Sequence, residues 1–419
     1  MMSQRILVWG WWVVLLSALA VTDARAETPE GQAIPLQLRP LTDVEMAFFE
    51  IPTAAYVDQR PPEELTAQPA YVDATPRFAH HQLPGPADDH ILTMVLDRSA
   101  PEATLYDVLY MDRDNDNDLA EEAPLHMTRQ NGFETYFEPV LLTFPVAGEV
   151  RKTLVRVRTF NLGPQGTPAA VLLHPAGCLE GSGRLDGKSC RVAVVDANLN
   201  GTYADAWERG RPGDLLLMDS NGDGQYDLKG SLPRFRSDEV RPFSPLWQIA
   251  GRWWDATVAQ DGSALTLAPT DREMGQVNYR GPEVKMVLSS RHLGILTATL
   301  TEGVSNFPAE EYSLQSARLT AKDEHGRQWA VDVAPPESEA PVRVATDSPW
   351  ELDFSTPLVA TVVVASPQPE QVGFSLTLKT TAGQAVASVT AAGGLPPEPT
   401  FVVTDASGRE VHSGKFEYG

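Results

Sequence analysis

The chain has 419 residues, with 56 Asp and Glu against 33 Lys and Arg, and a formal net charge of −23. Because affinity for nucleic acid comes mainly from Lys and Arg that neutralise phosphates, this balance excludes nucleic-acid binding as a function. The excess of acid favours solubility and the binding of cations. A chain of this length is too long for one ordinary core and predicts two or three domains.

The first 26 residues have the pattern of a secretory signal peptide. Arg5 supplies a positive charge, residues 6–21 are almost entirely apolar, and Ala24 and Ala26 are the small residues expected before a cleavage site. An uncleaved anchor and an interfacial helix are the alternatives. No later apolar run reaches the length of a membrane span. We therefore expect a periplasmic or secreted protein without a membrane span after signal removal.

The rest of the chain is typical of a mainly β protein. Residues 27–90 are rich in Pro and lack periodicity, which predicts an extended N-terminal segment. From residue 91 onward, short runs of branched and aromatic residues are separated by turn residues, as in strands. The run LVRVRTF at 154–160 is the clearest, because apolar residues and Thr alternate with Arg as in a half-buried strand.

The strand-like runs fall into three groups, which predict several β-sandwich-like domains with Asp-rich loops between strands. We expect a first β domain at 91–240, a second at 241–340, and a small sandwich of about five strands at 344–419. The Pro- and Glu-rich segment 334–343 is the predicted linker before the last of them.

Cys178 and Cys190 are the two cysteines of the chain. Since an exported protein folds in an oxidising compartment, we predict a disulfide that closes the Gly- and Ser-rich stretch between them. A redox-active or nucleophilic thiol is the alternative, and it would require a nearby His or a Cys-x-x-Cys spacing that the sequence lacks.

Three segments share one frame, in which an apolar run is followed by oxygen-bearing side chains at alternate positions and then by a hydrophobic residue. Loop 1 carries Asp112, Asp114, Asp116 and Asp118 at positions 1, 3, 5 and 7. Loop 2 carries Asp196, Asn198, Asn200 and Thr202 at the same positions. Loop 3 carries Asp219, Asn221, Asp223 and Gln225 there, and Asp227 at position 9.

This spacing suits calcium, which binds six to eight oxygens at about 2.3–2.6 Å. A chain that wraps around the ion directs side chains inward from positions 1, 3 and 5, turns at position 6, and offers the backbone carbonyl of position 7. Gly201 and Gly224 occupy position 6 in loops 2 and 3, where Gly turns without steric strain. Asn117, which tolerates the same conformation, occupies it in loop 1. We therefore predict calcium as the cofactor.

Loop 3 resembles the calcium loop of EF-hand and dockerin modules through position 9, and loops 1 and 2 resemble it more loosely. The three loops depart from that pattern at position 12, where EF-hands place Glu and this chain has Ala123, Trp207 and Gly230. Acids that could substitute from neighbouring positions are Glu121, Glu122, Asp205 and Glu208. The flanking runs read as strands instead of helices, as in exported bacterial β-rich proteins. The resemblance implies calcium chemistry on a different scaffold, and the spacing of loops 2 and 3 suggests a pair.

Other interpretations of these and nearby residues remain open. Asp, Asn and Gly also dominate metal-free tight turns, so the loops could bind nothing. A cluster of His and Asp at 80–90 matches no standard zinc spacing, and a solvated loop is the expectation there. Trp253, Trp254 and Trp329 could stack on carbohydrate, although core and edge positions are commoner for such residues.

No catalytic motif stands out in the sequence. It contains no nucleophile elbow, phosphate loop or zinc-protease helix, and no pair of acids is distinguished for glycoside hydrolysis. The leading hypothesis is an exported, calcium-stabilised, β-rich structural or binding protein whose partner is another surface or extracellular component. A calcium-dependent extracellular hydrolase of polysaccharide or peptide is the alternative.

Overall fold

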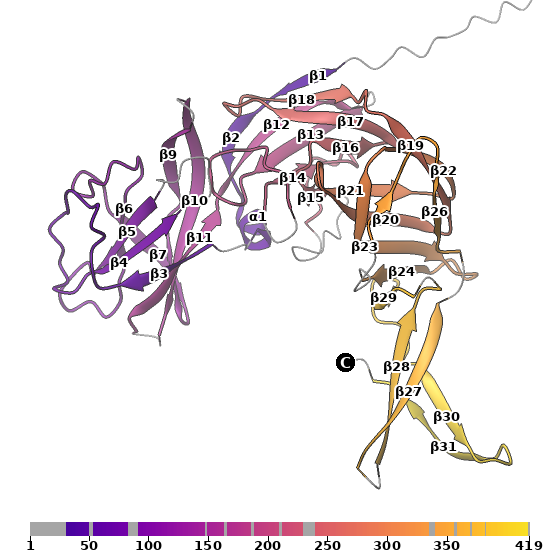
Figure 1. The fold of residues 1–419 in the computed structure, drawn as a ribbon. Helices are drawn as coiled ribbons and strands as arrows, with labels where there is room; N and C mark the ends of the chain where they lie inside the picture. The colour runs from indigo at the N-terminus through magenta and orange to yellow at the C-terminus, as the bar shows by residue number, and fades with distance from the viewer. Residues whose placement is uncertain are drawn as a thin grey trace, which may run out of the picture.

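The computed structural model describes residues 31–417, except 50–52, 83–90, 147–148, 163–165, 186–187, 209–211, 229–238, 335–339, 356–357, 369–370 and 382. The predicted signal peptide lies outside the described residues. The described chain is almost entirely β, with thirty-one strands and one short helix. It forms three β units in a curved row, and two hairpins project from the third unit (Figure 1). No described helix is long and apolar enough to cross a membrane.

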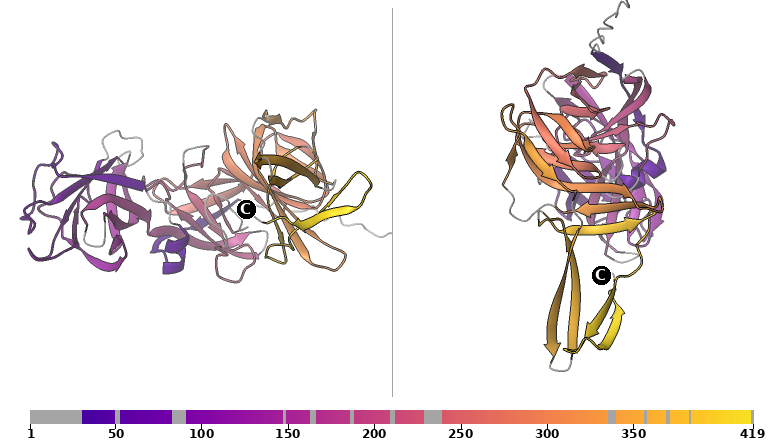
Figure 2. Two further views of the ribbon diagram at one scale, coloured as in Figure 1. Left: turned by 90° about the horizontal axis from the view of Figure 1, so that it is seen from below. Right: turned by 90° about the vertical axis from the view of Figure 1, so that its right-hand side faces the viewer.

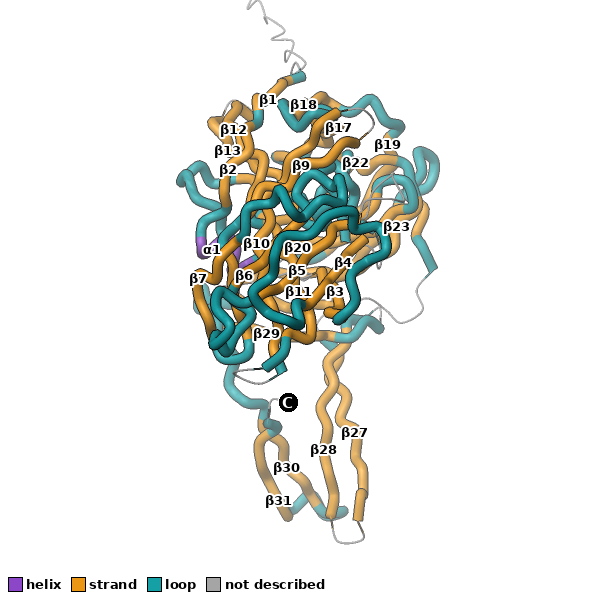
Figure 3. Tube along the Cα trace, turned by 90° about the vertical axis from the view of Figure 1, so that its left-hand side faces the viewer, coloured by secondary structure: helices purple, strands orange, loops and turns teal. Residues whose placement is uncertain are grey.

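The first unit is one antiparallel sheet of nine strands that closes on itself. Its order is β11-β3-β4-β5-β6-β7-β8-β10-β9, and β10 also pairs with β11. Apolar side chains inside this sheet form one core that includes Val155 and Val157, both 0% exposed. Figure 3 views the molecule from this unit's side, with the connections between strands drawn as loops. The strands are β3 (Thr53–Asp58), β4 (Arg77–Gln82), β5 (Ile91–Asp97), β6 (Val108–Met111), β7 (Leu125–Asn131), β8 (Glu134–Phe137), β9 (Val140–Val146), β10 (Glu149–Asn161) and β11 (Pro168–Pro175).

The middle unit is a sandwich of a five-stranded and a four-stranded sheet. The five-stranded order is β15-β14-β13-β12-β2 and the four-stranded order is β1-β18-β17-β16. One core lies between the two sheets, and a second core covers the outer face of the five-stranded sheet beside α1. The elements are β1 (Gln32–Pro35), β2 (Gln37–Pro40), α1 (Asp43–Phe48), β12 (Gly177–Leu185), β13 (Lys188–Val195), β14 (Leu215–Met218), β15 (Val240–Pro242), β16 (Leu246–Ile249), β17 (Arg252–Val258) and β18 (Ala264–Pro269).

The single helix α1 begins with a capping box. The Thr42 hydroxyl accepts from the backbone N–H of Glu45, and the Glu45 carboxylate accepts from the N–H of Thr42. Arg39 on β2 holds that carboxylate and also Glu180 on β12, so the helix is tied to the sheet.

The third unit packs the three-stranded sheet β22-β19-β26 against the six-stranded sheet β21-β20-β23-β24-β29, with β25 beside β23. A core that includes Met286, Leu288 and Phe307 separates the sheets. The strands are β19 (Met274–Arg280), β20 (Glu283–Ser290), β21 (Gly294–Leu300), β22 (Gly303–Pro308), β23 (Glu311–Lys322), β24 (Gln328–Val333), β25 (Val342–Arg343), β26 (Trp350–Asp353) and β29 (Val386–Ala391).

Two hairpins extend away from the third unit, as the right-hand view of Figure 2 shows. They are β27 (Val359–Gln368) with β28 (Gln371–Lys379), and β30 (Thr400–Thr404) with β31 (Glu410–Lys415). Phe374 and Phe401 pack ring against ring at 5.1 Å, which joins one hairpin to the other.

The fold divides the chain differently from the sequence prediction. Residues 27–90 are not a separate extended segment, because β1 and β2 belong to the middle unit and β3 and β4 to the first. The first unit, 53–175, is thus inserted between β2 and β12 of the middle unit. The expected boundary at 334–343 does not separate two domains, since β26 after it pairs with β19 and β29 pairs with β24. Of the sandwich predicted at 344–419, β26 and β29 therefore belong to the third unit, while β27–β28 and β30–β31 form two separate hairpins.

The predicted disulfide between Cys178 and Cys190 is wrong, and both thiols are free. The stretch between them forms the β12–β13 hairpin, in which Cys190 lies opposite Gly183. Cys178 is five residues further along β12, which places the two cysteines about 17 Å apart. They also face different cores on opposite sides of the sheet. A disulfide needs Cα atoms within about 7 Å, so this hairpin register forbids it.

Candidate metal-binding loops

Loop 1 lies in the first unit, directly after β6. Asp112 at position 1 is buried, at 1% exposure. Its two carboxylate oxygens accept from the backbone N–H groups of Asp116 at 3.2 Å and Asn117 at 3.0 Å. Asp116 in turn accepts from the N–H of Asp118 at 2.8 Å. The chain therefore curls around the first carboxylate, and Leu119 at position 8 leaves the loop fully buried at 0% exposure.

Acidic oxygens crowd together in loop 1. Those of Asp112, Asp114 and Glu122 lie within 4.8 Å of one another, and so do those of Asp114, Asp116 and Glu121. Burial raises the pKa of Asp112, and the carboxylates of Asp116, Asp114 and Asp118 raise the pKa of exposed Glu121. The cluster thus carries unfavourable charge that a divalent cation would offset.

Loop 2 follows β13 in the middle unit and has the same internal bonds. Asp196, 1% exposed, accepts from the N–H groups of Asn200 at 3.1 Å and Gly201 at 2.9 Å. Asn200 accepts from the N–H of Thr202 at 2.8 Å. Asp205 completes the loop, because its Oδ2 accepts from the Asn198 amide at 3.1 Å, from the Asn200 amide, and from the Thr202 hydroxyl at 2.7 Å.

Asp214 is a buried acid beside loop 2 that sequence reasoning missed. It precedes β14 and is 0% exposed. One carboxylate oxygen, Oδ2, accepts from the Asp205 N–H at 2.9 Å, while Oδ1 has no hydrogen-bond partner. Burial, then the charges of Asp196 and Asp205, raise the pKa of Asp214 well above its ordinary value. Burial likewise raises the pKa of Asp196 to about 7.

Loop 3 follows β14. Asp219, 5% exposed, accepts from Gly222 at 2.7 Å, Asp223 at 3.1 Å and Gly224 at 2.9 Å, all through backbone N–H groups. Asp223 accepts from the N–H of Gln225 at 2.9 Å. Arg191 on β13 also contacts this loop.

The Arg191 guanidinium donates to the Gly224 carbonyl at 2.7 Å and lies 5.0 Å from the centre of the Tyr226 ring. Glu239 also contacts loop 3. It is 3% exposed, and it accepts from the N–H of Ser220 at 3.0 Å and of Asp227 at 2.7 Å.

The three loops have a common backbone geometry. Position 1 accepts from the N–H groups of positions 5 and 6, and position 5 accepts from that of position 7, in each loop. Positions 4 and 6 are left-handed in each. The residues and φ values are Asn115 (62°), Asn117 (65°), Leu199 (60°), Gly201 (71°), Gly222 (78°) and Gly224 (81°). Gly and Asn adopt this conformation readily, so Leu199 is the one residue of the six that is unusual in it.

Each loop also has a buried acid beside it. In loop 1 this is Glu122, at 2.7 Å from the Arg113 nitrogen of position 2, and in loop 3 it is Glu239, at 3.0 Å from the Ser220 nitrogen of position 2. In loop 2 it is Asp214, which accepts from the Asp205 N–H. Of these, only Glu122 was among the substitutes expected from the sequence. The others were missed because strand pairing, not sequence distance, brings them to the loops. Glu208, another expected substitute, is exposed.

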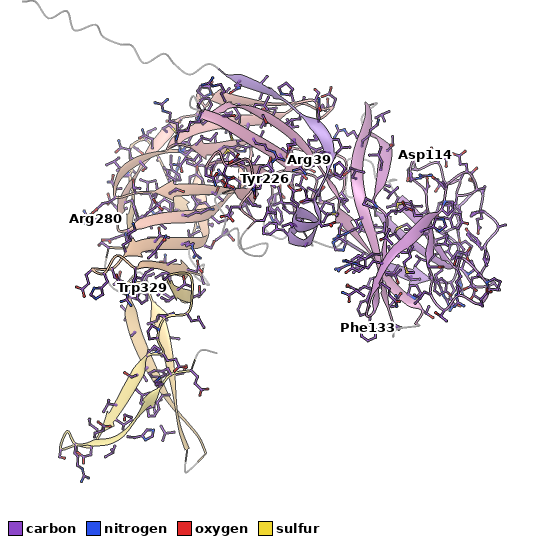
Figure 4. All side chains as sticks on the ribbon, turned by 180° about the vertical axis from the view of Figure 1, so that it is seen from behind. Arg39, Asp114, Phe133, Tyr226, Arg280 and Trp329 are labelled. Atoms are coloured by element: carbon purple, nitrogen blue, oxygen red, sulfur yellow. The ribbon has the colours of Figure 1, made fainter. Side chains whose placement is uncertain are left out.

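The structure does not pair loops 2 and 3. Antiparallel β13 and β14 place Val195 opposite Leu215 and Val192 opposite Met218, so the two loops leave opposite ends of the strands. Asp196 and Asp219 are separated by five residues of strand, which is about 17 Å. Loop 1 is in another unit, as the positions of Asp114 and Tyr226 in Figure 4 show. Each loop is therefore a separate candidate site.

The other sequence candidates form no common site. His80 and His81 lie on β4, and the remaining members of the 83–90 cluster are outside the described residues. Trp253 and Trp254 are 5% and 6% exposed and pack in two cores, so they offer no stacking platform. Comparison of the chain with protein-family models, curated proteins and solved structures finds no match.

Proposed function

We propose that the protein is an exported, calcium-stabilised structural or binding protein in which each of the three loops holds one calcium ion. The observation that carries this proposal is the repeated loop geometry with a buried acid beside each loop. A turn that only reverses the chain has no need to bury Asp112, Asp196 and Asp219 at 1%, 1% and 5% exposure. Burying carboxylates is unfavourable unless they are paired or bind a metal.

The oxygens available to an ion differ between the loops. Loop 1 offers Asp112, Asp114, Asp116, Glu122 and the Asp118 carbonyl. Loop 2 offers Asp196, Asn198, Asn200, Asp205 and the Thr202 carbonyl. Loop 3 offers Asp219, Asn221, Asp223, Asp227 and the Gln225 carbonyl. Since affinity rises with the number of charged ligands, loop 1 binds most tightly.

In this proposal calcium acts on stability and shape, not on catalysis. An ion bound only by the folded state adds RT ln(1 + [Ca]/Kd), which is about 2.7 kcal/mol at one hundred times Kd. Sites of the extracellular type have Kd values on the order of 10⁻⁴ to 10⁻³ M. Export, which the N-terminal sequence predicts, would take the protein to calcium concentrations that fill them.

The hydrolase alternative has no support from the acids whose pKa values are raised most. Asp196 and Asp214 are 1% and 0% exposed, so a polymer substrate does not reach them. Their perturbation follows from burial and mutual repulsion, which also occur in structural sites.

The proposal is tested in loop 1 by Asp114→Ala. Asp114 is exposed and lies in both acidic clusters, so its removal reduces calcium binding with little effect on the metal-free fold. Glu102→Ala is the matched control, since Glu102 is an exposed acid of the same unit outside the loop. Calorimetry should lose the tightest binding step in Asp114→Ala and keep it in Glu102→Ala. Equal calcium binding by both variants would contradict the assignment of loop 1.

A further inference from the structure

The two hairpins that project from the third unit lie outside the cores of the protein (Figure 1). Among the described strands, β27 pairs with β28 alone and β30 pairs with β31 alone. The clusters of buried hydrophobic residues in the described chain include none from these four strands. A hairpin of two strands is marginally stable in water by itself, and a third strand or a packed face is needed to stabilise it. The hairpins therefore depend on packing that the third unit does not supply.

One face of the β27–β28 hairpin is apolar and only partly covered. Val364 of β27 lies directly opposite Phe374 of β28, and two positions along the strand Val362 lies opposite Leu376. Because directly opposite residues share a face, these four side chains form one apolar surface. On β28 this surface is partly covered, since the Phe374 ring packs on Phe401 of β30 at 5.1 Å. On β27 it stays open, with Val362 49% and Val364 62% exposed.

The open part of this face adjoins the outer edge of β27. In the described chain no further strand pairs with that edge. Residues 359–366 read VATVVVAS and contain no charge, Pro or Gly, and the register with β28 stays regular as far as Ala365. Exposed sheet edges normally carry Lys, Pro or a bulge, which prevents pairing with another chain. Val363 on the opposite face is also 52% exposed, so the edge is apolar on both faces and suited to accept another strand.

The charge of the hairpins indicates which chain supplies that strand. The charged residues of segments 359–379 and 400–415 are Glu370, Lys379, Asp405, Arg409, Glu410 and Lys415. Three acids and three bases cancel, whereas the whole chain has a formal net charge of −23. Two copies of the chain repel each other through their acidic units, but they can approach through the neutral hairpins. A basic partner would instead be attracted to the acidic units, so the hairpin surface fits a second copy of this chain.

From these features we infer that β27 pairs edge to edge, in the antiparallel direction, with β27 of a second copy of this chain. The two hairpins then form one sheet of four strands, which meets the requirement that a two-stranded hairpin does not meet. Residues of one face lie opposite each other in an antiparallel pair, so the open valines of the two copies adjoin on the same side of the sheet. A twofold axis between the copies uses the open edge of each once, so the assembly closes as a dimer. This inference goes beyond the calcium proposal and does not rest on it.

The first test is sedimentation equilibrium of the full protein over a range of concentrations. We expect the mass of two chains at the highest concentrations and that of one chain on dilution. Raising the salt concentration should strengthen the dimer, because salt screens the repulsion between two acidic copies. A mass of one chain at every concentration, or a dimer that salt weakens, would overturn the inference.

Hydrogen exchange then locates the contact in the same samples. Exchange of the backbone amides of 359–368 should slow as the protein concentration rises, because the outer edge of β27 gains hydrogen bonds in the dimer. Exchange in 303–308, on β22, should not change with concentration. Equally slow exchange of 359–368 at every concentration would show that the same chain covers the edge, and it would contradict pairing between copies.

Two matched variants test the pairing itself. Val364→Lys places a charge on the open face of β27 and should weaken the dimer about tenfold or more. Val304→Lys adds the same charge at a Val that is 66% exposed on β22, which is also an outer strand of its sheet, and should leave the dimer unchanged. Because both side chains are exposed, both variants should keep the melting temperature of wild type. Equal weakening by the two variants, or weakening by neither, would contradict pairing through β27.

Discussion

Replacing Asp214 with Asn tests whether the buried carboxylates of loop 2 destabilise the metal-free fold and whether calcium offsets that destabilisation. Asp214 is 0% exposed, and its Oδ2 accepts the hydrogen bond from Asp205 while Oδ1 accepts none. An Asn side chain keeps the accepting oxygen and places its amide where Oδ1 was. The substitution therefore removes the ionisable group with little change in shape.

The magnitude follows from proton linkage. Because the pKa of Asp214 is raised in the folded state, its protonated form favours folding below about pH 3.9, and this contribution is lost as the pH rises towards the folded pKa. Each pH unit in that window lowers the free energy of unfolding by about 1.4 kcal/mol while the proton is retained. In chelator, the stability of Asp214→Asn relative to wild type should therefore increase from pH 5 to pH 7, by at most about 2.8 kcal/mol, which is the limit for a proton retained over the whole interval.

The assay is denaturant unfolding in chelator at pH 5 and pH 7, followed by tryptophan fluorescence. Trp207, Trp247 and Trp254 are all in the middle unit and report on its unfolding. Asp271→Asn, at an exposed acid after β18, is the control and should show no such gain. In calcium, the advantage of Asp214→Asn should shrink or reverse. A stability difference from wild type that is the same at both pH values would refute the reasoning.

Three further predictions concern the rest of the chain. Burial and the charges of Arg158 and Arg156 lower the pKa of His174 to about 3. The neutral form of this histidine therefore contributes fully to the free energy of unfolding above about pH 6.5, and that contribution is lost as the pH falls towards 3. Relative to wild type, the free energy of unfolding of His174→Leu should rise by about 2 kcal/mol from pH 7 to pH 5. His126→Gln, at an exposed histidine, is the control and should show no such rise. A difference between His174→Leu and wild type that is the same at both pH values would contradict the prediction. The thiols of Cys178 and Cys190 should both react with an alkylating reagent in unreduced, denatured protein. If neither thiol reacts, the two cysteines are bonded to each other. An isolated fragment of residues 344–419 should remain unfolded, since β26 and β29 pair with strands outside it; a cooperative β spectrum would show otherwise.

Much of the secondary structure could be predicted because its signal is local. The alternation in LVRVRTF gives β10, where Val155 and Val157 are 0% exposed and face the core of the first unit. The Asp-rich positions likewise fall between strands, as expected. The hydrophobic residue predicted at position 8 is buried in loop 1 and loop 2, at Leu119 and Tyr203. These features depend on residues close together in sequence, and period-2 patterning is sufficient for them.

The units and the closing acids could not be predicted, because both depend on long-range pairing. Nothing local indicates that β2 pairs with β12 across the whole first unit, or that β29 returns to β24. The disulfide prediction failed for the same reason. Cys178 and Cys190 are close in sequence, but the register of the β12–β13 hairpin sets their distance and places them on opposite faces of the sheet. Asp214 reaches loop 2 only because β14 runs antiparallel to β13, with Leu215 opposite Val195.

The most direct test of the account is the melting temperature of the full protein in chelator and in millimolar calcium, with calorimetry of calcium binding on the same sample. Calcium should raise the melting temperature of the first and middle units, which contain the loops, and magnesium should do so far less because it resists dehydration. The titration should show loop 1 as the tightest site. An unchanged melting temperature together with no heat of binding would contradict the account and leave the three loops as acidic turns.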